Sequence, residues 1–294
     1  MTPANLGVVE QDTEIRSETN MSANLVGTIF AAADTRSSNN MRSRTLPLLI
    51  FAILCVALTP QYSRGQAGPP LFTDDPDTPG NGHWEINFAV TVLQTRDTRL
   101  LGLPLVDVNY GLGERLQLKA EVPWLVLQDR HGESTQSGIG STNIGLKWRF
   151  VDHGEHGLAI STYPQLEIRT SASSARRMLV EPGSELRLPI EMSRELGPVK
   201  IVGEFGYQIV QHEKDEVIYG LAMEREVTKR FELLGELHGE AKRDFSEKKL
   251  LFNLGGRFKL MKDSTLLFSA GRSFRTALPD HPTFAAYVGL QFHF

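Results

Sequence analysis

The sequence predicts an all-β protein: a transmembrane antiparallel β-barrel of about 12 strands, preceded by a cleaved signal peptide. Three observations predict this class. Segments that alternate apolar and polar residues recur from residue 83 to the last residue, no helical period of comparable quality appears, and the connections between the segments alternate in length. Such alternation places successive side chains on opposite faces of a strand.

Twelve alternating segments follow one another. The first, HWEINFAVTVLQ, places Trp84, Ile86 and Phe88 on one face and Glu85 and Asn87 on the other. The predicted strands lie near 83–94, 103–110, 115–125, 141–150, 158–169, 184–193, 199–210, 216–226, 231–240, 249–260, 265–274 and 283–294. An even number of strands places both termini of the barrel chain at the same rim, which is expected to be the periplasmic one.

Three residues disturb this pattern. Pro164 in the fifth strand and Pro189 in the sixth each remove a donor from the ladder, and Arg272 falls on the apolar face of the eleventh. We expect bulges or a change of register in these three strands.

The apolar faces are predicted to meet outer-membrane lipid and the polar faces to line a wet lumen. Charges of both signs are mixed on the polar faces, and the segments have the length of about 10 residues that a tilted strand needs to cross a bilayer. Trp84, Trp124 and Trp148 lie at or near strand ends, as in an interfacial aromatic girdle. Short turns on one rim and longer polar loops on the other are typical of barrels in the outer membrane of a Gram-negative-type envelope. A soluble periplasmic β-sandwich is the alternative.

The N-terminal part divides into three segments. Residues 1–40 are predicted to be disordered or an over-extended start. We expect translation to begin at Met41 rather than at Met1 or Met21, with an unusually long leader as the alternative. Residues 41–67 predict a secretory signal peptide, with two arginines, an apolar run that is too short to span a membrane, and small residues before the cleavage site. The single cysteine, Cys55, lies in that apolar run, so the mature chain has no disulfide.

Residues 68–82 form a lead segment before the first strand. This stretch, rich in Asp, Pro and Gly, is expected to be periplasmic, strapped across the barrel mouth or tucked into it. Asp74, Asp75 and Asp77 suggest calcium, but the pattern of a calcium-binding loop and its closing Glu are missing. We therefore predict no metal site and no cofactor.

The chain ends on YVGLQFHF, in which Leu290, Phe292 and Phe294 share one face with a terminal aromatic. This pattern resembles the C-terminal segment that the barrel-assembly machinery reads in outer-membrane proteins. We predict that these three residues form the assembly signal and that the machinery is a partner.

The lumen predicts a channel through which small compounds, aromatic or hydrophobic ones included, diffuse passively. Candidate residues for an electrostatic filter are Lys119, Glu121, Lys147, Arg149, Glu167, Glu204 and Glu236. An apolar patch at the outer mouth would suit hydrophobic cargo, with Leu125, Val126, Leu127, Met178, Leu179 and Val180 as candidates. A structural or adhesive barrel with a closed lumen is the alternative. The net charge of −4 does not suggest nucleic acid as a partner, no catalytic residues are predicted, and the oligomeric state is open.

Three stretches carry a family resemblance: PPLFTDDPDTPGNGHWEIN, LVDVNYGLGERLQLKAEVPW and GIGSTNIGLKWRF. They resemble the outer-membrane proteins named for the meta-pathway of phenol degradation, a family of proposed transporters of aromatic or other hydrophobic compounds. The resemblance covers roughly 69–294. It implies a barrel of this size and a transport role, and it implies no binding residues.

Overall fold

The computed structural model describes residues 68–132, 134–154, 157–181, 183–274 and 282–294. These residues belong to one compact unit of the chain. The predictions for residues 1–67, namely the disordered start and the signal peptide, lie outside the described residues. No helix in the described ranges has the length and apolar character needed to cross a membrane.

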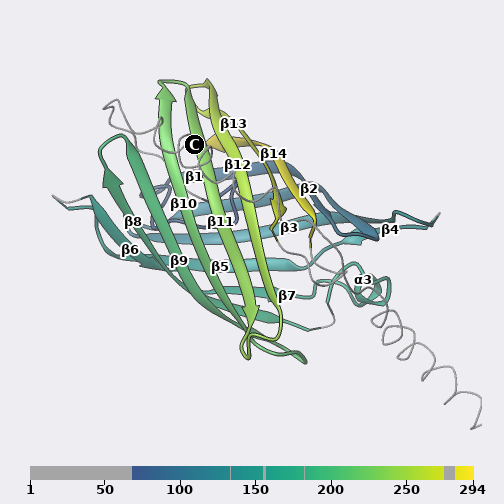
Figure 1. The fold of residues 1–294 in the computed structure, drawn as a ribbon. Coiled ribbons are helices and arrows are strands. Elements are labelled where there is room, and N and C mark those ends of the chain that lie inside the picture. Colours follow the sequence, from purple (N-terminus) through teal and green to yellow (C-terminus); the bar gives the residue numbers. More distant parts are fainter. Residues whose placement is uncertain (1–67, 133, 155–156, 182, 275–281) are drawn as a thin grey trace, which may run out of the picture. The chain divides into compact units, whose positions relative to one another are not determined.

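The described chain forms one antiparallel sheet that closes on itself. Its strands are β1 (Trp84–Gln94), β2 (Thr98–Gly111), β3 (Leu116–Asp129), β4 (Thr135–Ile139), β5 (Thr142–Val151), β6 (Leu158–Thr162), β7 (Gln165–Ile168), β8 (Glu185–Leu196), β9 (Val199–Val210), β10 (Glu216–Thr228), β11 (Phe231–Lys242), β12 (Lys248–Met261), β13 (Ser264–Ser273) and β14 (Phe284–His293). The short helix α3 (Ala172–Arg176) lies in the loop between β7 and β8. Figure 1 shows β8 to β13 crossing in front of β1, β2, β3 and β5.

The barrel has the twelve strands that the sequence predicts. The segments β4 and β5 follow each other along one side of β3, and β6 and β7 follow each other along β8, so each pair forms one interrupted strand of the barrel. The first and last strands, β1 and β14, are hydrogen-bonded and close the sheet. We call the rim at which β1 begins and β14 ends the short-turn rim, and the opposite one the long-loop rim.

The strands near the long-loop rim are longer than predicted. β2 begins at Thr98 rather than near residue 103, and β3 continues to Asp129, where the β4 segment pairs with it. Alternation alone missed these extensions because consecutive apolar residues, Leu100 with Leu101 and Val126 with Leu127, interrupt the period of two.

The three expected irregularities have different outcomes. Tyr163 and Pro164 separate β6 from β7, but the register with β5 is the same on both sides of this interruption. The register shift of the fifth strand lies at its other end, opposite Arg149 to Val151 of β5. The predicted disturbance at Pro189 is wrong, because β8 pairs with β9 without a register shift; Pro189 lies opposite Gly206, where a Cβ would come within 3.1 Å of the Cα of Pro189. The register also continues unbroken through Arg272, which is exposed near the end of β13, where a long side chain can reach the headgroup region.

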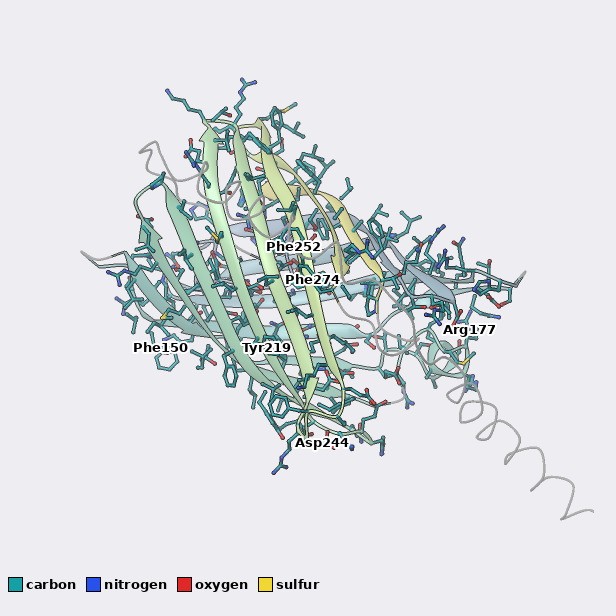
Figure 2. The ribbon with its side chains drawn as sticks, viewed as in Figure 1. Phe150, Arg177, Tyr219, Asp244, Phe252 and Phe274 are labelled. Carbon is teal, nitrogen blue, oxygen red and sulfur yellow. The ribbon has the colours of Figure 1, made fainter. Side chains whose placement is uncertain are left out.

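The barrel is polar inside and apolar outside. In β1, Glu85 and Asn87 are buried, whereas Trp84 and Phe88 on the alternate face are exposed. Phe150 on β5 points away from the barrel (Figure 2). This is the reverse of a soluble domain and suits lipid outside and polar groups inside.

Aromatic side chains cover parts of the outer face. The rings of Trp84 and Tyr110 have centroids 4.6 Å apart at the short-turn rim, and those of Phe252 and Phe274 are 5.9 Å apart. Tyr219 on β10 packs over Gly239 on β11, where a Cβ would lie 2.3 Å from the ring. Rings that lie over a strand glycine shield its backbone, which strengthens the sheet at that point.

Candidate functional site: the lumen and the lead segment

The lead segment, residues 68–82, runs inside the barrel. It enters at the short-turn rim, where the amide of Gly82 donates to the carbonyl of Gly111, and reaches the middle of the lumen, where Ser269 on β13 donates to the carbonyl of Pro70 at 2.7 Å. The amides of Phe72 and Thr73 donate to the carboxylate of Glu236 on β11 at 2.9 and 2.8 Å. The sequence leaves open whether the lead segment crosses the barrel mouth or enters it, and in the structure the segment enters the barrel.

An apolar contact fixes the inner end of the lead segment. Leu71 packs in a buried cluster with Val202 of β9, Ala222 of β10 and Leu234 of β11. Burying a leucine side chain contributes about 1.5–3 kcal/mol. The contact therefore adds to the hydrogen bonds that hold the segment in the lumen.

Each aspartate of the lead segment meets a cation of the wall. Lys147 Nζ lies 2.8 Å from Asp74, and Lys200 Nζ lies 2.6 Å from Asp75 and 2.7 Å from Asp77. Among the described residues, no group of His, Cys, Asp and Glu side chains could hold a metal ion. The structure thus pairs the three aspartates with lysines.

His153 extends this network at the short-turn rim. Its Nε2 lies 3.1 Å from Asp77, which also lies 3.5 Å from Arg149. The hydrogen bond to Asp77 raises the pKa of His153. Burial opposes ionisation of Asp77, but the hydrogen bonds from His153 and Lys200 outweigh it and hold the pKa of Asp77 below its usual range.

Asp75 has a different balance from its neighbour. Burial raises the pKa of Asp75, and the nearby charges of Lys200 and Lys147 offset this only in part. Asp75 is fully buried. The centre of the network therefore holds a carboxylate whose ionised form depends on the two lysines.

The predicted filter residues fall into two groups. Lys147, Arg149, Glu204 and Glu236 contact the lead segment, Glu204 by accepting from the amide of Asp74 at 3.0 Å. The other three residues, Lys119, Glu121 and Glu167, line a cavity beyond the lead segment. Their role in a filter stays a prediction.

Lys200 binds the lead segment but is not among the residues predicted for the filter. It belongs to the inward face of β9, as the alternation in this strand indicates, but its two aspartate partners lie more than a hundred residues away in the sequence. A periodic pattern reports the face of a residue and not its partner across a lumen.

Three glutamates on the inward face of β11, Glu232, Glu236 and Glu240, contact side chains of the neighbouring strand β12. Arg257 lies 3.0 Å from Glu232, and Lys249 lies 3.3 Å from Glu240. Asn253 donates to Glu236 at 3.0 Å. Pairs of this kind link neighbouring strands, so they help to fix the shape of the barrel.

A cavity of about 460 Å³ lies between the lead segment and the long-loop rim. Residues of the lead segment, including Leu71 and Phe72, form its floor. Of the candidate apolar patch, Leu125 lines the cavity, whereas Met178 is exposed and Leu179 is buried beside Gly138. The volume lies in the range of small-molecule sites.

The predicted assembly residues lie on the outer face at the short-turn rim. Leu290 and Phe294 are exposed, and the ring of Phe292 lies 6.3 Å from that of Phe88. The backbones of Trp84 and Phe294 exchange hydrogen bonds in both directions at 3.0 Å. The role of these residues in assembly stays a prediction.

Comparisons with solved structures agree with this architecture. A COG4313 outer membrane channel from Pseudomonas putida F1 is similar with a TM-score of 0.56 at 13% identity, over 78% of this chain and 100% of that one. The NanC porin is similar with a TM-score of 0.52 at 7% identity, over 70% and 98% of the two chains, and the KdgM porin with 0.50 at 12%, over 71% and 99%. The fold is that of an outer-membrane β-barrel. At these identities the likeness shows the fold alone.

Comparisons of the sequence add no family. No protein-family model and no curated protein matches this chain. The resemblance to the phenol meta-pathway family therefore remains an expectation from the sequence.

Proposed function

We propose that this protein is an outer-membrane channel through which small compounds diffuse. The observation that carries the proposal is a closed barrel, apolar outside and polar inside, that encloses a cavity open to small molecules. The fold shared with proteins named as channels and porins supports it. The proposal includes no enzymatic activity.

The lead segment is the main barrier in the proposed path. It occupies the lumen between the cavity and the short-turn rim and is held by ion pairs, hydrogen bonds and Leu71. A compound that reaches the cavity from the long-loop rim continues only past this segment. Passage therefore needs a displacement of the segment or a route around it.

Aromatic or hydrophobic compounds are the substrates that we propose first. Part of the cavity wall is apolar, with Leu105, Pro123 and Leu125 among its residues, and apolar walls favour such compounds. A structural barrel is the second candidate, favoured by the ion pairs that close the lower lumen.

Electrical recording tests the proposal. The protein, extracted from membranes of an expressing cell, is inserted into a planar bilayer, and we expect discrete, small current steps. A variant in which Glu236→Gln weakens the hold on the lead segment is expected to give larger or more frequent steps. A folded barrel without steps in both forms would favour the structural role.

A further inference from the structure

The cavity above the lead segment has two unlike walls. Its apolar residues come from three strands, β2, β3 and β14, which lie on one side of the ring around β1: Leu100, Leu105, Pro123, Leu125, Ala285 and Tyr287. Four of its six carboxylates come from the opposite side of the ring: Glu167, Glu185, Glu204 and Glu240 of β7, β8, β9 and β11. We call these the apolar wall and the acidic wall. The other two carboxylates are Asp74 of the lead segment and Glu121 of β3, which pairs with Lys119.

The lining of the cavity as a whole has more carboxylates than the neighbouring cations neutralise. Among the described residues that line the cavity, six are carboxylates and two, Lys119 and Arg187, are cations. Lys147 and Lys249 reach two of the carboxylates, Asp74 and Glu240, from outside the lining. Two carboxylates remain in excess, which makes the cavity attractive to a positive charge.

The excess is concentrated at one cross-strand pair. Glu167 on β7 and Glu185 on β8 lie directly opposite each other in the ladder, an arrangement that repels when both are ionised. Glu185 accepts a hydrogen bond from Gln208, and the described residues give Glu167 no ion-pair partner. Arg187 donates to the neutral amide of Gln208 at 3.2 Å, and among the described residues it forms no ion pair with either glutamate. A cation between the two glutamates would relieve the repulsion.

Two other lining residues have hydrogen-bonding capacity to spare. Tyr287 is 9% exposed and Asn253 is 1% exposed, and both line the cavity. The hydroxyl oxygen of Tyr287 and Oδ1 of Asn253 have no hydrogen-bond partner among the described residues. Both atoms accept hydrogen bonds but are covered by neighbouring atoms, so a ligand with N–H donors would reach them only after a movement of side chains.

The shape of the site argues against a bare metal ion. The described carboxylates of the cavity form no cluster able to ligate a metal, and the side chains of Leu105, Pro123 and Leu125 opposite the acidic wall offer no oxygen. A volume of about 460 Å³ holds a molecule larger than an ion. The ligand must present a positive charge to one wall and an apolar surface to the other.

We infer that the cavity binds small organic cations with an apolar body, such as arylalkylamines. The ammonium group lies against the acidic wall near Glu167 and Glu185, and the apolar body lies against Leu105, Pro123 and Leu125. The inference deepens the proposed function, since it names the class of compound that the channel would admit. A neutral aromatic compound gains only the apolar contact.

Three ligands that share an aromatic ring and differ in charge test this inference. Binding of phenethylamine, 2-phenylethanol and phenylacetate is measured by calorimetry on the whole protein in lipid nanodiscs, with empty nanodiscs as the blank. We expect phenethylamine to bind at least about tenfold more tightly than 2-phenylethanol, and phenylacetate to bind most weakly. Added salt should weaken the binding of the amine and leave that of the alcohol unchanged.

Variants assign the preference to the acidic wall. The double variant E167Q/E185Q should lose most of the preference for the amine and keep the affinity for the alcohol. Glu195→Gln is the matched control, because Glu195 is exposed at the other end of β8. If the double variant does not fold, the three ligands on the unaltered protein and the single variant E185Q give the answer.

The outcomes separate this inference from the proposed function. Equal affinity for the amine and the alcohol, tighter binding of phenylacetate, or no binding of the amine would overturn the inference, whatever the current recordings give. A preference for the amine that the double variant retains would also overturn it. Binding of the amine by a protein without current steps would leave the inference in place and remove the channel.

Discussion

The two halves of the lumen balance their charges in different ways. Between the short-turn rim and the middle, the aspartates of the lead segment meet Lys147 and Lys200 at 2.6 to 2.8 Å, and little space remains. Between the middle and the long-loop rim, a cavity of about 460 Å³ has more carboxylates than cations. The same strand alternation produces both halves. They differ because a second segment supplies the counter-charges of one half only.

This difference changes how charges in a barrel lumen are interpreted. Of the seven residues that the sequence suggests for a filter, Lys147, Arg149, Glu204 and Glu236 contact the lead segment in this structure. A charged residue that faces a lumen can serve to hold a segment in place. Contacts with that segment distinguish this role from contact with a solute.

The largest expected effect concerns assembly of the barrel, on which both halves of the lumen depend. Deletion of Phe294 should lower the amount of assembled barrel in the outer membrane strongly. It should lower the free energy of unfolding of refolded protein by only about 1–3 kcal/mol, because the side chain is largely exposed and the loss is mainly that of the two backbone hydrogen bonds with Trp84. Heat-modified gel migration of membrane fractions measures the assembled amount. Phe284→Ala, an exposed aromatic at the other end of β14, is the control. Equal yields from the deletion and the parent would contradict the prediction.

Lys200→Met should loosen the lead segment, so that the half of the lumen near the short-turn rim is no longer filled and neutralised by it. Removing one partner of a buried ion pair costs about 3–5 kcal/mol, and Lys200 serves both Asp75 and Asp77. Thr73→Cys reports the loosening. Position 73 is fully buried, so the introduced thiol reacts with a polar maleimide only when the segment leaves the lumen. We expect strongly faster labelling of the reporter in K200M.

Two controls accompany this experiment. Lys249→Met removes a lysine of the cavity half, whose pair with Glu240 is partly exposed, and should change the labelling little. The parent chain without the reporter gives the background from Cys55. The same labelling rate in K200M and K249M would show that the ion pairs of Lys200 do not hold the segment.

Gly220→Ala should loosen the segment by crowding rather than by charge. A Cβ at Gly220 would lie 2.4 Å from Oγ1 of Thr73 and 2.9 Å from its Cγ2, so the lead segment must shift, at a cost of about 1–3 kcal/mol. Current recordings should show longer open times. Gly203→Ala on the adjacent strand is the matched control, since a Cβ there meets nothing within 4 Å. Identical open times in the two variants would contradict the predicted crowding.

The smallest expected effect is a pH dependence from His153. Because the pKa of His153 is raised by Asp77, its charged form stabilises the inserted segment fully below the ordinary histidine pKa of about 6.5, and this contribution is lost as the pH rises through the folded-state pKa. The lowered pKa of Asp77 keeps that carboxylate ionised over this range. The effect should stay below about 1 kcal/mol, because His153 is partly exposed.

Labelling of the Thr73→Cys reporter between about pH 6 and pH 8 measures this effect. The rate should rise more with pH in the parent than in the His153→Gln variant, which corrects for the pH dependence of the reagent. Parallel pH profiles would show that His153 does not contribute.

The alternation of apolar and polar residues predicted the strands of the barrel, but it did not predict the path of the lead segment inside the lumen. Alternation from Trp84 to Phe294 gives the strands and their faces, because each strand exposes one face to lipid, and Pro164 marks the interruption of the fifth strand. The path of the lead segment has no such period: its Asp, Pro and Gly residues adopt turns, and its partners Lys147, Lys200 and Glu236 are distant in the sequence. Pairing across the lumen depends on the stagger of the strands, which alternation does not reveal.

The seam between β1 and β14 joins the first strand of the barrel to the last. The lead segment precedes β1 directly and enters the lumen beside that seam, where Trp84 and Phe294 exchange hydrogen bonds. The circle of hydrogen bonds is therefore completed only when β14 pairs with β1. The pairing that closes the barrel therefore also encloses the lead segment, which is bonded to β11 and β13 inside the lumen.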